Sequence, residues 1–265
     1  MTDAKALRKE QYSDSSKLQA RAGLHAGYST NPQGWLNWLF EQLALTPGSQ
    51  ILELGCGPGS LWRENRERIP ASLTCMLSDL SIGMAREARA SLAAEGGQFT
   101  FGTMDAQKLP FLDDRFDTVI ANHMLYHIAD LDQALGEIYR VLKTGGKLYA
   151  ATNGRDHLVE MEEMITRYEP RAKSQLANIG FNLENGAEVL GEFFARVAVR
   201  RYSDSLEVDE AKPLVDYILS MARLVRLHLG EEQREALTAF IEAELAVHGS
   251  LHFTKSPGLF IASKD

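Results

Sequence analysis

The residues Ile51-Leu-Glu-Leu-Gly-Cys-Gly-Pro-Gly59 join a short apolar run to a turn that contains three glycines. The run has the length and composition of a buried β-strand, and a helical pattern follows the turn. Glycines at such a junction let a ligand approach the backbone, and the free amides at the helix start favour an anionic or polar group. The stretch therefore predicts a ligand site at the carboxyl end of this strand.

The spacing of the glycines distinguishes two kinds of ligand. A dinucleotide fingerprint, G-x-G-x-x-G, needs glycine or alanine at position 60, where this chain has Ser60. The third glycine, Gly59, comes one position early, and a carboxylate, Glu53, stands two residues before the first glycine. A nicotinamide-dependent oxidoreductase therefore stays an alternative that Ser60 and Gly59 disfavour.

Short apolar runs alternate with helical patterns through the rest of the chain. The clearest helix is 130–142, with Asp130 and Gln133 as a capping box and Gly145-Gly146 as its end. This alternation predicts parallel βαβ units in a doubly wound α/β sheet. The ranges predicted as strands are 51–54, 73–77, 98–101, 116–121, 146–151, 194–202 and 259–262.

The chain has 265 residues, more than a typical domain of about 100–200 residues but fewer than two such domains. We assign the surplus to helices above one cleft. An N-terminal helical arm covers 1–45, with a helix that begins at Asn31-Pro32. The remaining residues, 46–265, form one domain with helical lid inserts at about 155–180 and 206–250.

Further acidic residues follow the glycine turn in order. Asp79 ends the second strand, where the two oxygens of a carboxylate can accept both hydroxyls of a ribose. Asp105 follows the third strand, and Arg140-Val-Leu-Lys-Thr-Gly-Gly146 leads into the fifth. With the E-x-G-x-G-x-G pattern of 53–59, this order resembles the class I S-adenosylmethionine-dependent methyltransferases with a type 11 methyltransferase domain. The resemblance is close over about 49–152.

The resemblance implies a Rossmann-like sheet of seven mostly parallel strands with the last strand antiparallel. It also implies S-adenosylmethionine as cofactor and methyl transfer to an oxygen, nitrogen or carbon nucleophile of a small molecule. Because the sulfonium is already activated, such an enzyme mainly aligns donor and acceptor for in-line displacement and excludes water. A protein that binds S-adenosylmethionine without turnover remains a further alternative.

The resemblance also assigns roles to residues. Asp79 is expected at the ribose and Asp105 at the adenine amino group, while Tyr12 or Tyr28 could face the sulfonium through a cation–π contact and Arg21 could bind the carboxylate. Structural alternatives stay open: Asp79 could cap a helix, Asp105 could be a solvated loop residue, and the aromatic residues of the arm could pack in a groove. The residues predicted to bind the cofactor are Tyr12, Arg21, Tyr28, Glu53, Gly55, Gly57, Gly59, Asp79, Leu80, Asp105, Ala106 and Asn122.

The residues Asn122-His-Met-Leu-Tyr-His127 follow the fourth strand. Ligands of doubly wound sheets bind beyond the carboxyl ends of strands, so these side chains are expected at the mouth of the cleft. His123 is predicted as a general base, because histidine titrates near neutrality, although it could also pack beside the cofactor. His127 is similar to a family position that carries histidine or tryptophan, and it is predicted either to act in catalysis or to fix this loop.

Composition excludes several other classes of function. The net charge of −8 argues against nucleic acid as the partner, because binding a phosphate backbone needs a basic face. Two cysteines, Cys56 and Cys75, indicate neither a disulfide framework nor a zinc site, so no metal is expected. No apolar run approaches the roughly 18 residues that span a bilayer, and the first residues lack the apolar core of a signal peptide. We therefore expect a cytoplasmic protein that acts on a small molecule.

Overall fold

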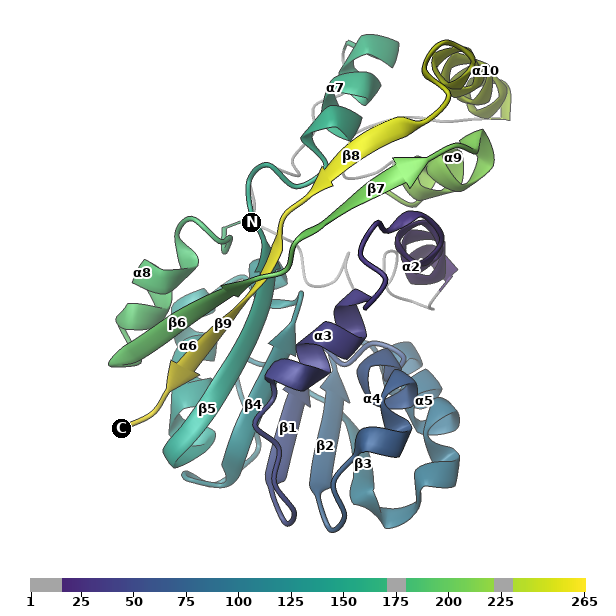
Figure 1. Cartoon of the computed structure of the whole chain (residues 1–265). Coiled ribbons are helices and arrows are strands. Elements are labelled where there is room, and N and C mark those ends of the chain that lie inside the picture. The colour runs from purple at the N-terminus through teal and green to yellow at the C-terminus, as the bar shows by residue number, and fades with distance from the viewer. Residues whose placement is uncertain (1–15, 171–179, 222–230) are drawn as a thin grey trace.

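A seven-stranded sheet forms the centre of the computed structural model, which describes residues 16–170, 180–221 and 231–265 (Figure 1). The strand order is β3-β2-β1-β4-β5-β9-β6. Neighbouring strands from β3 to β5 pair in parallel, whereas β9 pairs antiparallel with both β5 and β6. The predicted fold class, including the antiparallel last strand, is confirmed. The strands are β1 (Gln50–Leu54), β2 (Thr74–Asp79), β3 (Phe99–Thr103), β4 (Phe116–Asn122), β5 (Leu142–Asn153), β6 (Arg196–Arg201) and β9 (Pro257–Ser263).

Helices cover both faces of the sheet because successive residues of each strand point to opposite sides. In β4, Val119 packs on the side of the helices α6 and α8, while Ile120 packs on the side of α3 and α4. Both residues are completely buried. These helices are α3 (Trp35–Gln42), α4 (Ser60–Glu64), α5 (Ile82–Ser91), α6 (Leu131–Val141) and α8 (Gly186–Gly191), with short 3₁₀ turns η2 (Arg66–Arg68), η3 (Ala93–Gln98) and η4 (Leu125–His127).

A second group of elements, which we call the lid, lies above the carboxyl ends of the parallel strands (Figure 1). Its centre is a two-stranded antiparallel sheet, and helices from three separate parts of the chain pack around it. The lid has a hydrophobic core of its own, in which Met161, Met164 and Met221 are buried. Its elements are α2 (Ser16–Tyr28), α7 (Val159–Tyr168), β7 (Asp204–Val208), α9 (Ala211–Ser220), α10 (Glu231–His248) and β8 (Leu251–Lys255).

The lid differs from its prediction as a purely helical insert. The strands β7 and β8 were not predicted, because each has only five residues and they pair across more than 40 positions of sequence. Helices do occupy most of the remaining predicted range, although 222–230 and 171–179 lie outside the described residues. The lid is therefore a small mixed α/β layer, in which β8 is joined to β9 of the main sheet by Ser256 alone.

Two predicted helix ends are also wrong. The helix expected to begin at Asn31-Pro32 begins at Trp35, because the Asn31 side chain accepts a hydrogen bond from the Gln33 amide and Gly34 has a φ of 74°. The cap of α6 by Asp130 is confirmed by its bond to the Gln133 amide. However, α6 ends at Val141, because Leu142 already pairs with β4, and Gly145 then turns within an irregular part of β5.

The strand β6 forms one outer edge of the main sheet, and most of its residues are exposed. Its arginines Arg196, Arg200 and Arg201 place charge along this edge, which disfavours pairing with the strand of another molecule.

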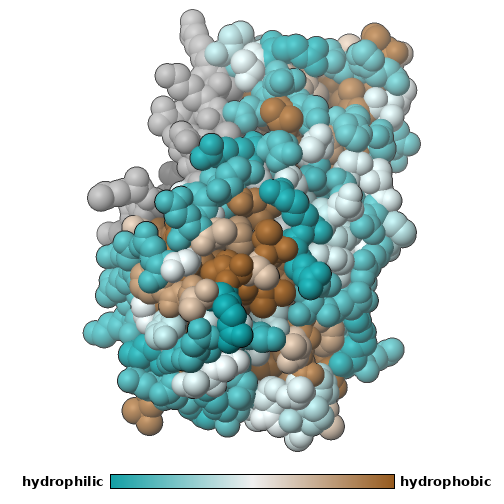
Figure 2. Space-filling view, turned by 60° about the vertical axis from the view of Figure 1, so that its left-hand side comes forward, coloured by the Kyte–Doolittle hydropathy of each residue, from teal (hydrophilic) through white to brown (hydrophobic). Residues whose placement is uncertain are grey.

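Figure 2 turns this side of the molecule forward and shows an area of hydrophobic residues bordered by hydrophilic ones.

A buried ion pair connects the segments of the lid. Asp204, the first residue of β7, pairs with Lys255, the last residue of β8, and their side chains are 0% and 7% exposed. The same carboxylate accepts hydrogen bonds from the Ser29 hydroxyl at 2.5 Å and from the Asn31 amide at 3.0 Å. Although burial opposes ionisation, the bonds from Lys255 and Ser29 lower the pKa of Asp204. The pair therefore joins β7, β8 and the segment after α2.

Replacing one partner should destabilise the protein strongly. Asp204→Asn leaves the Lys255 ammonium buried without a counter-charge, which costs about 3–5 kcal/mol in comparable pairs. The matched control is Lys212→Met, which removes an exposed pair with Asp216 and should cost less than about 1 kcal/mol. Urea unfolding at pH 7 measures both. Equal stability of the two variants would contradict the importance of the buried pair.

Candidate active site

The turn after β1 adopts a conformation that needs its glycines. Gly55, Gly57 and Gly59 have φ values of 67°, 53° and 77°, in the left-handed region that other residues rarely adopt. At Gly55 there is a second reason, because an added Cβ would lie 2.7 Å from Cβ of Met124. Gly59 directly precedes α4, so the free amides of the turn and of the helix start lie together at the carboxyl end of β1.

Asp79 lies beside this turn at the end of the neighbouring strand β2. Its Oδ2 accepts from the Gly57 amide at 3.0 Å and its Oδ1 from the Ser81 amide at 2.8 Å. Burial raises the pKa of Asp79, and these backbone bonds partly offset that effect. The Ser81 hydroxyl caps α5 by accepting from the Met84 amide. A carboxylate has about four lone-pair positions, so these backbone bonds orient Asp79 and still leave it able to accept from a ligand.

Glu53 lies beneath the turn and is only 2% exposed. Its Oε2 accepts a hydrogen bond of 2.6 Å from the indole of Trp62, a fully buried residue of α4. Burial raises the pKa of Glu53 to about 8, and the nearby charge of Asp79 raises it as well. The hydrogen bond from Trp62 lowers the pKa but does not outweigh burial. Glu53 therefore fastens α4 to β1, and its predicted contact with the cofactor stays a prediction.

The other residues predicted near the adenine end differ in exposure. Asp105 is exposed, and its Oδ1 accepts from the backbone amide of Gln107 at 2.9 Å and from its side chain at 3.0 Å. Ala106 is buried and Leu80 is half-buried. Asp105 follows β3 directly, next to Asp79, because the Met104 amide bonds to the Asp79 carbonyl. The structure thus places Asp79 and Asp105 at the same edge of the sheet.

The segment after β4 meets the helix α3. The indole of Trp35 donates to Oδ1 of Asn122 at 3.3 Å, and its ring centroid lies 5.2 Å from that of His123. His123 has a φ of 55°, which is uncommon outside glycine, and its amide bonds to Ala151 of β5. Trp35 was not predicted as a site residue, although its place among the aromatic residues of the arm was a signal.

Four histidines surround this region, two of them from the lid. The ring centroid of His25 on α2 lies 6.3 Å from that of His157, which precedes α7. Burial lowers the pKa of His25 to about 3 and those of His123 and His127 to about 4, and it also lowers the pKa of His157 well below its ordinary value. Neighbouring charges, Lys255 among them for His25, His123 and His157, add to the effect. All four rings are therefore neutral at pH 7.

The predicted contacts of the arm are less direct. The Arg21 guanidinium donates to the Ser220 hydroxyl of α9 at 3.2 Å and lies near enough to His127 to lower its pKa. Tyr28 packs against the lid core, where the charge of Glu210 helps burial to raise its pKa. Tyr12 lies outside the described residues. In the structure, Arg21 contacts α9 through Ser220, and Tyr28 lies near Glu210, which directly precedes α9. The contact of either residue with a cofactor stays a prediction.

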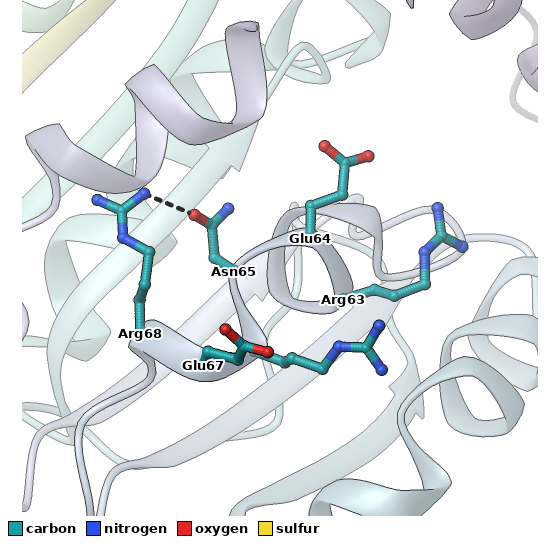
Figure 3. Close-up of a pocket in the computed structure, with 6 residues that line it drawn as sticks. Arg63, Glu64, Asn65, Glu67 and Arg68 are labelled. Atoms are coloured by element: carbon teal, nitrogen blue, oxygen red, sulfur yellow. Dashed lines mark hydrogen bonds between the residues drawn. The ribbon is translucent and has the colours of Figure 1, made fainter. Parts of the chain in front are cut away.

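A surface hollow lies away from this region. The pocket of Figure 3 is a charged surface hollow lined by 63–68 at the end of α4, and it contains none of the predicted site residues. Within the described ranges, no three or more histidine, cysteine, aspartate or glutamate side chains are arranged to hold a metal ion. Nor does this part of the chain contain a helix that is long and apolar enough to cross a membrane.

Comparisons with known proteins agree with this geometry. Residues 52–150 match the family model described as a methyltransferase domain. A ubiquinone/menaquinone biosynthesis C-methyltransferase from Laribacter hongkongensis is 35% identical over 114 residues, which are 43% of this chain and 47% of that protein. The protein of the same name from Pasteurella multocida is 25% identical over 198 residues, 74% of each chain. Residues 52–150 therefore resemble the methyltransferase domain of the class I S-adenosylmethionine-dependent methyltransferases.

Solved structures support the methyltransferase fold over nearly the whole chain. Phosphoethanolamine N-methyltransferase 2 of Haemonchus contortus, solved with phosphomonomethylethanolamine and S-adenosylhomocysteine, has a TM-score of 0.62 and 20% identity, covering 98% of this chain and 60% of that one. The [4+2]-cyclase SpnF has the same TM-score at 19% identity, covering 98% and 96%. The alignment with the Laribacter methyltransferase spans about half of that protein, so the acceptor must be argued from this chain itself.

The residues of the methyltransferase cleft fit S-adenosylmethionine, the cofactor of this family. The left-handed glycines keep side chains out of the space above β1, and Asp79 presents oriented carboxylate oxygens there. Neutral polar groups follow at the end of β4, at Asn122 and His123. A dinucleotide fingerprint is missing, so the family match and the geometry both favour S-adenosylmethionine over the nicotinamide alternative.

Removing the Asp79 carboxylate should weaken cofactor binding. Hydrogen bonds to a charged group contribute about 1.5–3 kcal/mol, so Asp79→Ala should weaken the affinity for S-adenosylhomocysteine by about 10- to 100-fold. Isothermal titration calorimetry measures the change. Asp132→Ala, which alters an exposed carboxylate in the first turn of α6, is the control. Unchanged affinity in Asp79→Ala would refute the ribose assignment.

The buried histidines should make stability depend on pH. The folded pKa values of His25, His123, His127 and His157 lie below the ordinary 6.5, so the unfolded chain takes up protons first as the pH falls. The free energy of unfolding should therefore decline as the pH falls from about 6.5 towards 4. The raised pKa values of Glu53 and Asp79 act in the opposite direction, but they are two groups against four.

Urea unfolding at pH 7 and pH 5 measures this decline. His157→Gln should show a smaller loss of stability between the two pH values than the wild type, because one of the four groups is gone. His248→Gln, at the exposed end of α10, should show the same loss as the wild type. If His157→Gln lost as much stability between pH 7 and pH 5 as the wild type does, His157 would not be one of the groups that cause the decline.

Proposed function

We propose that this methyltransferase transfers the methyl group of S-adenosylmethionine to a small-molecule acceptor bound between the carboxyl ends of β4 and β5 and the lid. The observation that carries the proposal is the group of neutral histidines at that place, beside the glycine turn and Asp79. Relatives named as C-methyltransferases of ubiquinone and menaquinone biosynthesis support a small organic acceptor. The net charge of −8 also argues against a nucleic-acid acceptor.

When bound, the cofactor supplies a methyl group on an activated sulfonium. The residues of the chain then perform three tasks. The glycine turn and Asp79 orient the bound cofactor through amides and carboxylate oxygens. The lid, with α2 packed on α9 and β7, excludes water from the cleft. His123 receives a proton from the acceptor at a ring nitrogen, because its buried ring is neutral over the working pH range.

His127 is proposed to position this loop. The 3₁₀ turn η4 ends at His127, whose amide bonds to the Met124 carbonyl at 3.0 Å. Its ring centroid lies 4.5 Å from that of Tyr126, which in turn lies 6.4 Å from His123. A change at His127 therefore reaches His123 through Tyr126, without direct contact with the acceptor.

Methyl transfer to a panel of phenols, enols and amines, followed by mass spectrometry of the acceptor, tests the proposal. The wild type should add one methyl group to at least one class. His123→Gln should slow that transfer by about 10²-fold or more at unchanged affinity for S-adenosylhomocysteine, since general-base catalysis contributes this much. Exposed His248→Gln is the control.

Two outcomes would contradict the proposal in different ways. Binding of S-adenosylhomocysteine without methylation of any acceptor would favour a protein that binds the cofactor without turnover. Equal rates in His123→Gln and the wild type would leave methyl transfer in place but remove His123 as the base.

A further inference from the structure

Two histidines that the methyltransferase sequence motifs do not include meet in the lid. His25 lies in the last turn of α2, and His157 lies between β5 and α7, more than 130 positions later. Their ring centroids are 6.3 Å apart and the rings are inclined by 31°. Neither ring touches the glycine turn, so neither is needed to explain how the cofactor is bound.

The tautomer of His157 follows from its backbone partner. The Ser256 amide donates to Nδ1 of His157 at 3.1 Å. A ring nitrogen that accepts a hydrogen bond carries no proton, so the proton of the neutral ring is on Nε2. Burial lowers the pKa of His157 well below its ordinary value, which agrees with a neutral ring. His157 therefore offers a fixed N–H donor through Nε2.

His25 contributes a ring nitrogen without a partner. Its Nδ1 is buried and makes no hydrogen bond within the described residues. Buried polar atoms nearly always have a partner, so this nitrogen can take part in a hydrogen bond with a ligand group. The ring of Tyr217 packs perpendicular to that of His25, with 5.6 Å between the two ring centroids.

The charges around the two rings favour an uncharged ligand group. The nearest cation, Lys255, is held by Asp204, and Arg21 bonds to Ser220. Lys255 and His123 both lower the pKa values of His25 and His157, so a further cation would be repelled. A protonated amine is therefore a poor occupant. A carboxylate is disfavoured as well, because Asp204 lies near His25, and Lys255, within the described part of the chain, is already paired with Asp204.

We propose that His25 and His157 bind the acceptor through one neutral hydroxyl group, whose oxygen accepts from Nε2 of His157 and whose proton is donated to Nδ1 of His25. Two hydrogen bonds of about 2.8 Å that meet at one oxygen separate two imidazole centroids by about 6–7 Å, which matches the observed spacing. The ring of Trp35 beside His123, with Tyr202 packed on it, suits a planar group carrying this hydroxyl. The proposed substrate class is thus a phenol or an enol.

This inference rests on the proposed methyl transfer, but its test does not depend on turnover. The probe is 4-nitrophenol, titrated by absorbance at pH 6, where it is mostly neutral, into the full-length protein saturated with S-adenosylhomocysteine. His25→Phe and His157→Phe each keep a ring but remove its nitrogens, and each should weaken binding of the probe by about tenfold or more. His25→Asn restores a polar group near the place of Nδ1 and should bind within a few-fold of the wild type.

Control measurements distinguish a failure of the proposed function from a failure of the proposed hydroxyl site. His248→Asn, on the exposed end of α10, should bind the probe as the wild type does. Calorimetry with S-adenosylhomocysteine should give equal affinities in all variants, which shows that each is folded. If the wild type does not bind S-adenosylhomocysteine, the proposed function fails. If it does bind, but the probe is not bound or is bound equally by both phenylalanine variants, the hydroxyl site is refuted.

Discussion

The lid depends on the buried pair between Asp204 and Lys255. This pair fixes the start of β7 to the end of β8, and the Asp204 carboxylate also holds Ser29 and Asn31, directly after α2. The position of α2 sets the position of His25, while β8 continues into Ser256, the partner of His157. One ion pair therefore determines whether the two histidines meet. Because a buried pair is costly when it is broken, the lid is held in one arrangement.

The cofactor side of the cleft could be predicted from the sequence because it is built locally. The three glycines take left-handed conformations within five residues, and Asp79 lies one strand away in a parallel pair whose register is fixed by apolar residues. Such short-range constraints can be recognised from the spacing of residues in the sequence. The same reasoning gave the sheet and α6, since burial of alternate strand residues and of one helix face also repeats over a few positions.

The lid could not be predicted in the same way. β7 and β8 are short, exposed on one side and paired across two helices, so neither run alone indicates a strand. Nothing near His157 in the sequence suggests a partner for its side chain. Its neighbours, His25 and Ser256, lie about 130 and 99 positions away. The acceptor side is thus assembled from contacts that only the folded chain contains.

Burial has opposite consequences for the two kinds of ionisable group in the cleft. It raises the pKa of Glu53 and Asp79 at the glycine turn, where a cationic cofactor would restore their charged forms. It lowers the pKa of the histidines under the lid, so their rings remain neutral and can exchange hydrogen bonds with an uncharged group. Desolvation therefore opposes ionisation on both sides of the cleft. Under the lid it leaves neutral imidazoles, which suit the uncharged hydroxyl group proposed for the acceptor.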